Sequence, residues 1–201
     1  MMQMQKIKRL CLDSGCFAIV NADGRQWLGD GAALFEVPGA LKISAGMLPA
    51  LYELTDKQVE GCNWKTMDAE TLARGGVELE DNVEGDVLLY EVPASVTIAG
   101  EALKMLHSAD GEISLMVKQS ELAPAEKYTQ ALYYARRAGS GWAVAIKNGY
   151  ALVAYIMPYR IGEGAVSDAV IRMRDMLGRM IESEKLRGTV RVDPETGEVR
   201  E

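Results

Sequence analysis

Residues 142–157 have the sequence WAVAIKNGYALVAYIM, in which two apolar runs, 142–146 and 150–157, flank Lys147-Asn148-Gly149. Both runs contain valine or isoleucine together with aromatic residues, and these residue types favour strands. Asn-Gly is the preferred central pair of a type I′ turn, because both central positions need a positive φ. The stretch therefore predicts a β-hairpin that turns at Asn148 and Gly149.

More strands are predicted on the N-terminal side of this hairpin. The β-prone runs 17–20 and 25–28 flank the turn sequence Asn21-Ala22-Asp23-Gly24, which predicts another hairpin. Residues 113–117 alternate as a strand does. The chain is thus expected to be rich in β-structure on both sides of its middle.

An internal repeat is visible when the chain is compared with itself. Residues 34–38, LFEVP, recur as LYEVP at 89–93, an offset of 55 that continues without a gap. Each copy predicts a strand that ends at proline, a second extended run and then a helix. The extended runs are 41–43 and 96–98, and the helices are 45–54 and 100–108, with Leu48 and Leu51, or Leu103 and Leu106, facing inward. Coincidence between two amphipathic segments is the alternative.

Two further helices are expected in the C-terminal half. Pro124 opens the first, Gly139 marks its end, and Tyr128, Leu132 and Ala135 form its inner face. The second runs from Ser167 to about residue 187 after a short glycine linker. Its apolar stripe consists of Val166, Val170, Met173, Leu177 and Met180. Valines on both sides of a Pro-Gly-containing turn at 193–197 predict a small terminal hairpin or a frayed end.

Composition limits the class of protein. The 201 residues are 48% hydrophobic, which is enough to bury a core, and the net charge of −7 opposes non-specific adhesion to nucleic acid or anionic membrane. No apolar stretch is long enough to span a bilayer, and the start is polar and basic. Three cysteines at unrelated spacings favour a reducing compartment. We therefore expect a cytoplasmic protein without a membrane partner.

Catalytic and metal-binding patterns are missing from the sequence. His107 is the single histidine and has no motif that would orient it as a general base, so a packing or surface role is expected. Cys11 and Cys16 lack the second pair of ligands that a zinc site needs, which favours ordinary buried thiols. No glycine-rich phosphate loop precedes a helix. These observations predict a non-enzymatic protein without a cofactor or a metal site.

Charge is distributed unevenly along the chain. Residues 76–91 hold six acids and no base, whereas residues 127–161 hold five bases and no acid, interleaved with seven of the thirteen aromatic residues. Cationic side chains beside flat rings can bind single-stranded nucleic acid or a protein hot spot. The candidate binding residues are Tyr133, Tyr134, Arg136, Arg137, Lys147, Tyr150, Tyr159 and Arg160. The alternative is that most of these rings fill the core and that the acidic run is a solvated edge.

Three segments resemble known proteins. Residues 20–28, VNADGRQWL, 41–54 and 154–161, AYIMPYRI, are similar to strands and a helix of the bacterial DNA polymerase sliding clamp. Residues 26–34, QWLGDGAAL, resemble a run in uncharacterised phage and prophage proteins of gut bacteria. The clamp resemblance implies a domain duplicated from a unit of one helix and several strands. The phage resemblance implies origin and no function.

Together these observations predict an α+β protein with a duplicated, DNA-clamp-like strand-helix-strands unit. The expected parts are residues 1–75, residues 76–161 and a C-terminal amphipathic helix with a short tail at 162–201. The leading hypothesis is a phage-type accessory protein that binds nucleic acid or a replication protein. The alternative is an acidic inhibitor that uses residues 78–91 against a basic host protein surface. The C-terminal helix could also hold a homo-oligomer together.

Overall fold

A computed structural model describes residues 4–39, 42–126, 128, 130–160, 176, 179, 191–192 and 199–200. The helices are α1 (Met4–Ser14), the 3-10 turn η1 (Ala45–Met47), α2 (Leu48–Leu51), α3 (Asp56–Gly61), α4 (Ala69–Arg74) and α5 (Gln119–Leu122). The strands are β1 (Cys16–Ala22), β2 (Arg25–Gly29), β3 (Ala33–Val37), β4 (Asn63–Asp68), β5 (Val87–Ile98), β6 (Glu101–Ser108), β7 (Ser114–Lys118), β8 (Ala131–Ala138), β9 (Gly141–Asn148), β10 (Ala151–Ile156), β11 (Arg191–Val192) and β12 (Val199–Arg200).

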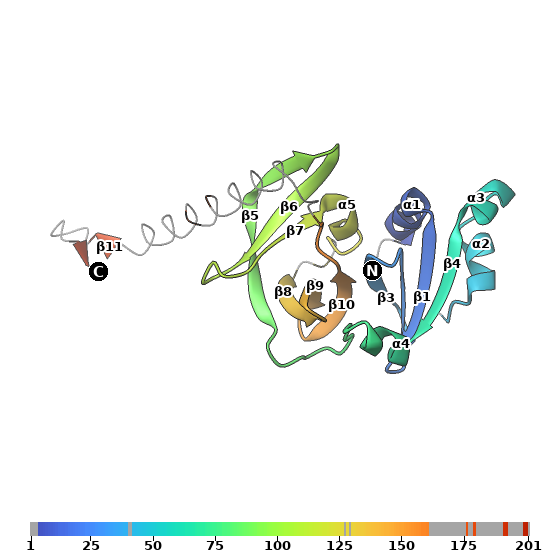
Figure 1. The fold of residues 1–201 in the computed structure, drawn as a ribbon, viewed down its shortest axis with the longest axis horizontal. Helices are drawn as coiled ribbons and strands as arrows, with labels where there is room; N and C mark the ends of the chain where they lie inside the picture. The colour runs from blue at the N-terminus through green and yellow to red at the C-terminus, as the bar shows by residue number, and fades with distance from the viewer. Residues whose placement is uncertain are drawn as a thin grey trace.

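Ten of these strands form one sheet in the order β4-β1-β2-β3-β10-β9-β8-β5-β6-β7 (Figure 1). Neighbouring strands are antiparallel, except that β4 runs parallel to β1. The pairing of β3 with β10 joins the N-terminal strands to the last strand, in chain order, of the ten-stranded sheet. The structure therefore confirms a mixed α+β protein in which the sheet dominates.

Successive residues of the strands belong to different cores, as the two-residue period of a strand requires. On β1, Phe17 and Ile19 belong to the first core, which also contains residues of α1 and α5. Ala18 and Val20 belong to the second core, on the other face, with residues of α4. A third, smaller core lies on β5, β6 and β7. The helices therefore cover the sheet from both sides.

A helix followed by three antiparallel strands occurs twice in the chain: α1 precedes β1, β2 and β3, and α5 precedes β8, β9 and β10. The third strands of the two groups, β3 and β10, pair with each other. Figure 1 shows α1 and α5 as neighbours, and Lys6 Nζ donates to the Ala123 carbonyl oxygen over 3.1 Å. This likeness is one of element order, and it differs from the residue repeat described above.

Both predicted hairpins are present, and one has a different turn from the one expected. Asp23 and Gly24 have φ of 51° and 73° between β1 and β2, as a type I′ turn requires. In the other hairpin Asn148 pairs with Ala151, so the loop residues are Gly149 and Tyr150. Gly149 has φ of 62° at the first central position, where a type II′ turn needs a positive φ. The turn is thus one residue later than predicted.

The prediction that residues 100–108 form a helix is wrong, so the two copies of the predicted unit do not fold alike. Residues 101–108 form β6, which pairs with β5 on one side and β7 on the other. The first copy has η1 and α2 at this place, with Pro49 at the start of α2. The equivalent residue of the second copy is Lys104, which can donate in a ladder as proline cannot. β5 also continues through Pro93, where its register with β6 shifts.

The helix expected from Pro124 to Gly139 is also absent. Residues 131–138 form β8 between β5 and β9. Their sequence, ALYYARRA, contains several good helix formers, but hydrogen bonds to strands on both sides decide the conformation. Of the expected inner face, Ala135 is buried whereas Leu132 is 46% exposed.

The remaining comparisons between prediction and structure concern the N-terminal helix α1, residues 113–117 and the C-terminal part of the chain. Sequence analysis predicted no element at α1, although Ile7, Leu10 and Cys11 have helical spacing and are buried. The predicted strand at 113–117 is confirmed as β7. The C-terminal helix predicted from Ser167 lies outside the described residues, apart from Met176 and Arg179. β11 and β12 pair antiparallel, which confirms the terminal hairpin.

Replacement of Gly29 by alanine should destabilise the protein strongly. A Cβ at this position would lie 1.7 Å from the Ala33 carbonyl oxygen, across the turn between β2 and β3. Overpacking of this kind costs about 1–3 kcal/mol or more. Urea unfolding of Gly29→Ala should show this loss in the free energy of unfolding. Gly46→Ala is the control, because a Cβ there meets no atom within 4 Å. Equal stability of the two variants would contradict the tight turn.

Candidate functional site

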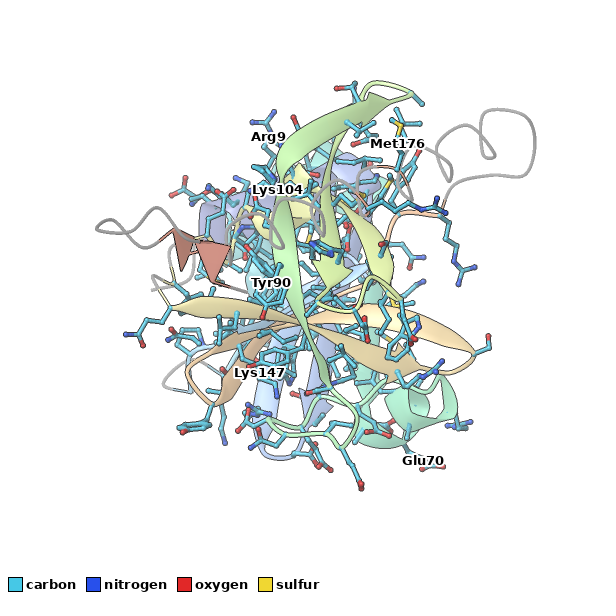
Figure 2. All side chains as sticks on the ribbon, turned by 90° about the vertical axis from the view of Figure 1, so that its left-hand side faces the viewer. Arg9, Glu70, Tyr90, Lys104, Lys147 and Met176 are labelled. Atoms are coloured by element: carbon cyan, nitrogen blue, oxygen red, sulfur yellow. The ribbon has the colours of Figure 1, made fainter. Side chains whose placement is uncertain are left out.

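The eight candidate binding residues lie on β8, on β9 and next to the ends of β10, but they divide between the interior and the surface. Arg136 is completely buried and Lys147 is 6% exposed. Both side chains contact the crossing segment, which we define as residues 77–86 between α4 and β5. Figure 2 labels Lys147 at its position on the sheet. These two bases therefore have structural partners within the chain.

Arg136 uses its whole guanidinium to hold the crossing segment. Its Nε and Nη2 donate to the two carboxylate oxygens of Asp86 over 2.9 and 2.7 Å. Its Nη1 donates to the carbonyl oxygens of Glu78 and Glu80 over 3.0 and 2.7 Å. A bidentate pair with additional carbonyl acceptors satisfies a buried guanidinium. Arg136 is thus unable to reach a partner at the surface.

Lys147 approaches the same carboxylate from β9. Its Nζ lies 2.9 Å from Asp86 Oδ2 and 4.5 Å from the centre of the Tyr134 ring. Burial alone would raise the pKa of Asp86. The hydrogen bonds and positive charges of Arg136 and Lys147 lower this pKa by more than burial raises it, so the net pKa is below the usual range. Asp86 is therefore a charged, buried bridge between two strands.

Arg25 holds the crossing segment at a second place. Its Nη1 donates to Asp81 over 2.7 Å and its Nη2 donates to the Leu79 carbonyl oxygen over 2.6 Å. Asp81 also accepts the backbone N–H of Leu152 over 2.8 Å, at the register shift of β10. An N–H left without a ladder partner at such a shift needs another acceptor. The crossing segment thus contacts β2, β8, β9 and β10.

The acidic run is partly neutralised by these contacts. Asp81 and Asp86 face bases of the sheet, and Glu91 lies 2.8 Å from Lys104 Nζ. Glu78, Glu80 and Glu84 are exposed. The predicted solvated acidic edge is therefore confirmed for these three carboxylates and is wrong for Asp86, whose side chain is buried. Asp81 pairs with Arg25 although its side chain is 45% exposed.

Arg137 is exposed and lies on a ring. Its guanidinium carbon is 3.9 Å from the centre of the Trp142 ring, and the two residues are directly opposite each other on β8 and β9. Trp142 is half-buried and packs against the first core, which fixes the ring. Trp142 was not among the predicted binding residues. The signal that finds it is the symmetric spacing of both residues around the turn at Gly139 and Ser140.

The remaining candidates differ in burial. Tyr133 is half-buried against the first core, and Tyr134 lies beneath Lys147. Tyr150 is 88% exposed at its turn. The Tyr159 N–H donates to the Met116 carbonyl oxygen and its ring contacts Lys118, whereas the neighbouring Arg160 is exposed. The structure therefore brings Arg136 and Lys147 together inside the protein and leaves Arg137, Tyr150 and Arg160 at the surface.

The single histidine and the three cysteines can be placed in the structure. His107 is 1% exposed and its ring is tilted against that of Tyr90 at 6.3 Å, so a packing role is confirmed. Cys11 is buried, which raises the pKa of its thiol, and Cys16 and Cys62 are also free thiols. Among residues 4–39, 42–126 and 130–160, no group of three or more His, Cys, Asp or Glu side chains could hold a metal ion.

Glu121 is the buried carboxylate among five described side chains with an unpartnered buried polar atom, the others being Trp27, Tyr52, His107 and Tyr155. It is 5% exposed, and its Oε2 has no hydrogen-bond partner among the described residues. Burial, the larger cause, and the charge of Asp30 together raise the pKa of Glu121 to about 7 against the opposing charge of Lys118. The raised pKa favours the protonated form of Glu121 in the folded protein.

Comparisons with known proteins do not assign the chain. No family model matches it, and neither a curated protein nor a solved structure is significantly similar. In the described part of the chain, no helix has both the length and the apolar character needed to cross a bilayer. The function must therefore be argued from the residues themselves.

Replacement of Asp86 by alanine should remove the bridge under Arg136 and Lys147. Breaking a buried ion pair on one side costs about 3–5 kcal/mol, because the remaining charges stay buried without a counter-charge. Chemical denaturation should show a loss of this size in Asp86→Ala. Glu84→Ala is the matched control, since Glu84 is an exposed acid of the same segment. If both variants unfold at the same denaturant concentration, the bridge does not support the fold.

Glu121 should make the protein less stable as the pH rises from about 4.5 to about 7. The folded state then holds a proton that the unfolded state has released, so each pH unit in this window costs up to about 1.4 kcal/mol. Glu121→Gln removes this cost, and its advantage over the natural protein should grow across the window and stay constant above it. Glu112→Gln, at an exposed acid, should show no such trend. Parallel stability profiles for Glu121→Gln and the natural protein would contradict a raised pKa.

Proposed function

We propose that the protein is a non-enzymatic, phage-type accessory protein that binds single-stranded nucleic acid, with Arg137 and Trp142 at the centre of the binding surface. The observation that carries this proposal is the exposed Arg137 guanidinium, 3.9 Å above the centre of a fixed indole ring. The resemblance of three segments to the sliding clamp favours a role in DNA replication over other roles for such a surface.

A stacked guanidinium is suited to this task. A guanidinium that stacks on a ring keeps its N–H donors in its own plane, where they stay available for phosphate oxygens. The ring orients the charge before a ligand arrives, which lowers the entropic cost of binding. Proteins that bind single strands combine cationic groups with aromatic rings in this way. Tyr150 and Arg160 are additional exposed groups of the same kinds.

The arrangement of elements supports the clamp-like part of the proposal. The sliding-clamp domain is a duplicated unit of one helix and several strands, and here a helix precedes three antiparallel strands twice. α1 and α5 lie beside each other, and α1 carries Lys6, Lys8 and Arg9. Lys6 and Lys8 donate to carbonyl oxygens, whereas the Arg9 side chain is 85% exposed. The leading hypothesis from the sequence also includes a replication protein as the partner in place of nucleic acid.

The acidic inhibitor is less favoured because its charge is reduced. Of the six acids at 76–91, Asp81, Asp86 and Glu91 are paired with bases of the sheet. The acidic surface that remains consists of Glu78, Glu80 and Glu84. These three residues supply no aromatic or apolar side chain that could anchor a partner. Electrostatic steering alone gives on-rate more than affinity.

Arg137→Ala should weaken the binding of a labelled single-stranded oligonucleotide of about 20 nucleotides by roughly tenfold at low salt. Fluorescence anisotropy measures this, and the slope of log affinity against log salt should fall by about 0.7 when one phosphate contact is lost. Arg137→Lys should keep the salt dependence but lose affinity, because an ammonium does not stack as a planar guanidinium does.

Arg74→Ala is the matched control, because Arg74 is an exposed base on α4 whose ion pair with Glu70 is long, at 3.9 Å. Arg136 is unsuitable for substitution here, since its loss would unfold the crossing segment. Absence of oligonucleotide binding at low salt, or equal binding by the natural protein and Arg137→Ala, would remove the proposal. If the natural protein captures a replication protein, Arg137→Ala does not, and neither binds nucleic acid, then the replication protein is the partner.

A further inference from the structure

A hollow of about 370 Å³ lies beside the turn between β1 and β2. It is lined by the hairpin residues 21–26, by Glu36 and Val37 at the end of β3, and by Gly39 and Lys42. Sites for small molecules typically have volumes of roughly 300–1,000 Å³, so the hollow is at the small end of this range. The nucleic-acid surface proposed above involves none of these residues.

The Gln26 side chain of β2 fixes one wall of the hollow. The Gln26 amide donates to the Ile43 carbonyl oxygen over 2.8 Å and accepts the Ile43 N–H over 2.7 Å. This pair holds the chain next to Lys42 against β2. The same Gln26 nitrogen donates to Asn21 over 3.0 Å. Because both ends of the amide are used, the wall is set before any ligand binds.

Glu36 is the unusual group of the hollow. Arg25 Nη1 lies 2.7 Å from Asp81 Oδ1 but 3.6 Å from Glu36 Oε1. The second nitrogen of Arg25 donates to Leu79, so a single guanidinium serves Asp81 first and Glu36 second. Burial raises the pKa of Glu36, and the positive charge of Arg25 does not fully offset it. A cation brought next to Glu36 would stabilise its charged form.

Lys42 supplies the opposite charge at the same hollow. It is exposed, and among the described residues no ion pair involves it. Beside the exposed carboxylate of Asp23, the hollow therefore offers the partly buried carboxylate of Glu36, whose counter-charge is incomplete, and the ammonium of Lys42, which has no ion pair among the described residues. A ligand that carries both a cation and an anion satisfies both groups, whereas a simple anion is repelled by Glu36.

We propose that this hollow binds a small zwitterion, with a primary ammonium group of the ligand on Glu36 and a carboxylate group on Lys42. The hydrogen-bonding groups of Asn21 and Arg25 line the same space and would bind the polar atoms between the two charges. The volume admits a molecule of amino-acid size and excludes a folded protein segment. The site is independent of the nucleic-acid surface, so each can fail without the other.

Titration with 4-aminobutyrate, followed in amide NMR spectra, tests the proposal. The amides of Gly24 and Gly39 should shift in a saturable way, since both residues line the hollow. Butylamine and butyrate, which carry one charge each, should bind about tenfold more weakly or not at all. Binding should also weaken as the pH falls and Glu36 takes up a proton.

Glu36→Gln should reduce the affinity for 4-aminobutyrate at least about tenfold, and Lys42→Met should reduce it for 4-aminobutyrate but not for butylamine. Glu84→Gln, at an exposed acid outside the hollow, is the matched control and should bind normally. Amide spectra of each variant show whether it is folded, and the comparison of 4-aminobutyrate with the one-charge probes on the natural protein needs no variant. Absence of saturable shifts at millimolar concentrations, or equal binding by Glu36→Gln, would overturn the proposal.

Discussion

The carboxylate of Asp86 between Arg136 and Lys147 is the interaction on which the rest of the sheet's second face depends. Its two oxygens are 2.7–2.9 Å from donors on β8 and β9, inside the protein. Burial of three charges is unfavourable unless each has its partners, and here the carbonyl oxygens of the crossing segment complete the set. The crossing segment therefore has one well-satisfied position, and Leu79 enters the second core as a consequence. The ion bridge at Asp86 thus determines where the apolar side chain of Leu79 packs.

This bridge also explains why the charges are separated along the sequence. The acid-rich segment before β5 and the base-rich strands β8 and β9 are about fifty residues apart, yet they meet in the fold: Arg136 and Asp86 differ by 50 positions. A like-charged segment does not pair with itself, so each run is available to the other. From the sequence alone the acidic run was interpreted as a solvated edge or an inhibitor surface, and the basic run as a binding surface or as part of the core. Part of each is instead the partner of the other.

The strands that were predicted are those in which local sequence and tertiary structure agree. Asp23-Gly24 supplies two positive φ values, and Gly149 supplies one, so these hairpins were found from the sequence. β6 and β8 were missed because ALKML and ALYYARRA contain good helix formers, and only pairing on both sides makes them strands. Ala99, with φ of 51°, turns β5 into β6 at a residue type that rarely does so. The residue repeat was real as a sequence pattern, but Pro49 and its counterpart Lys104 send the two copies to different structures.

The same distinction decides which part of the candidate site was predictable. Arg136 and Arg137 are neighbours of one residue type, and as a helix both were expected near the surface. On a strand, successive side chains point to opposite faces, so one enters the ion bridge and the other lies on Trp142. Once β8 is known to be a strand, only every second residue of it can share a face with Arg137. The register of the β8–β9 hairpin then identifies Trp142 as the ring opposite Arg137, which composition alone does not show. Arg137 is therefore the base that remains available for binding, because the ion bridge uses Arg136 instead. It lies on the face of the sheet opposite that bridge.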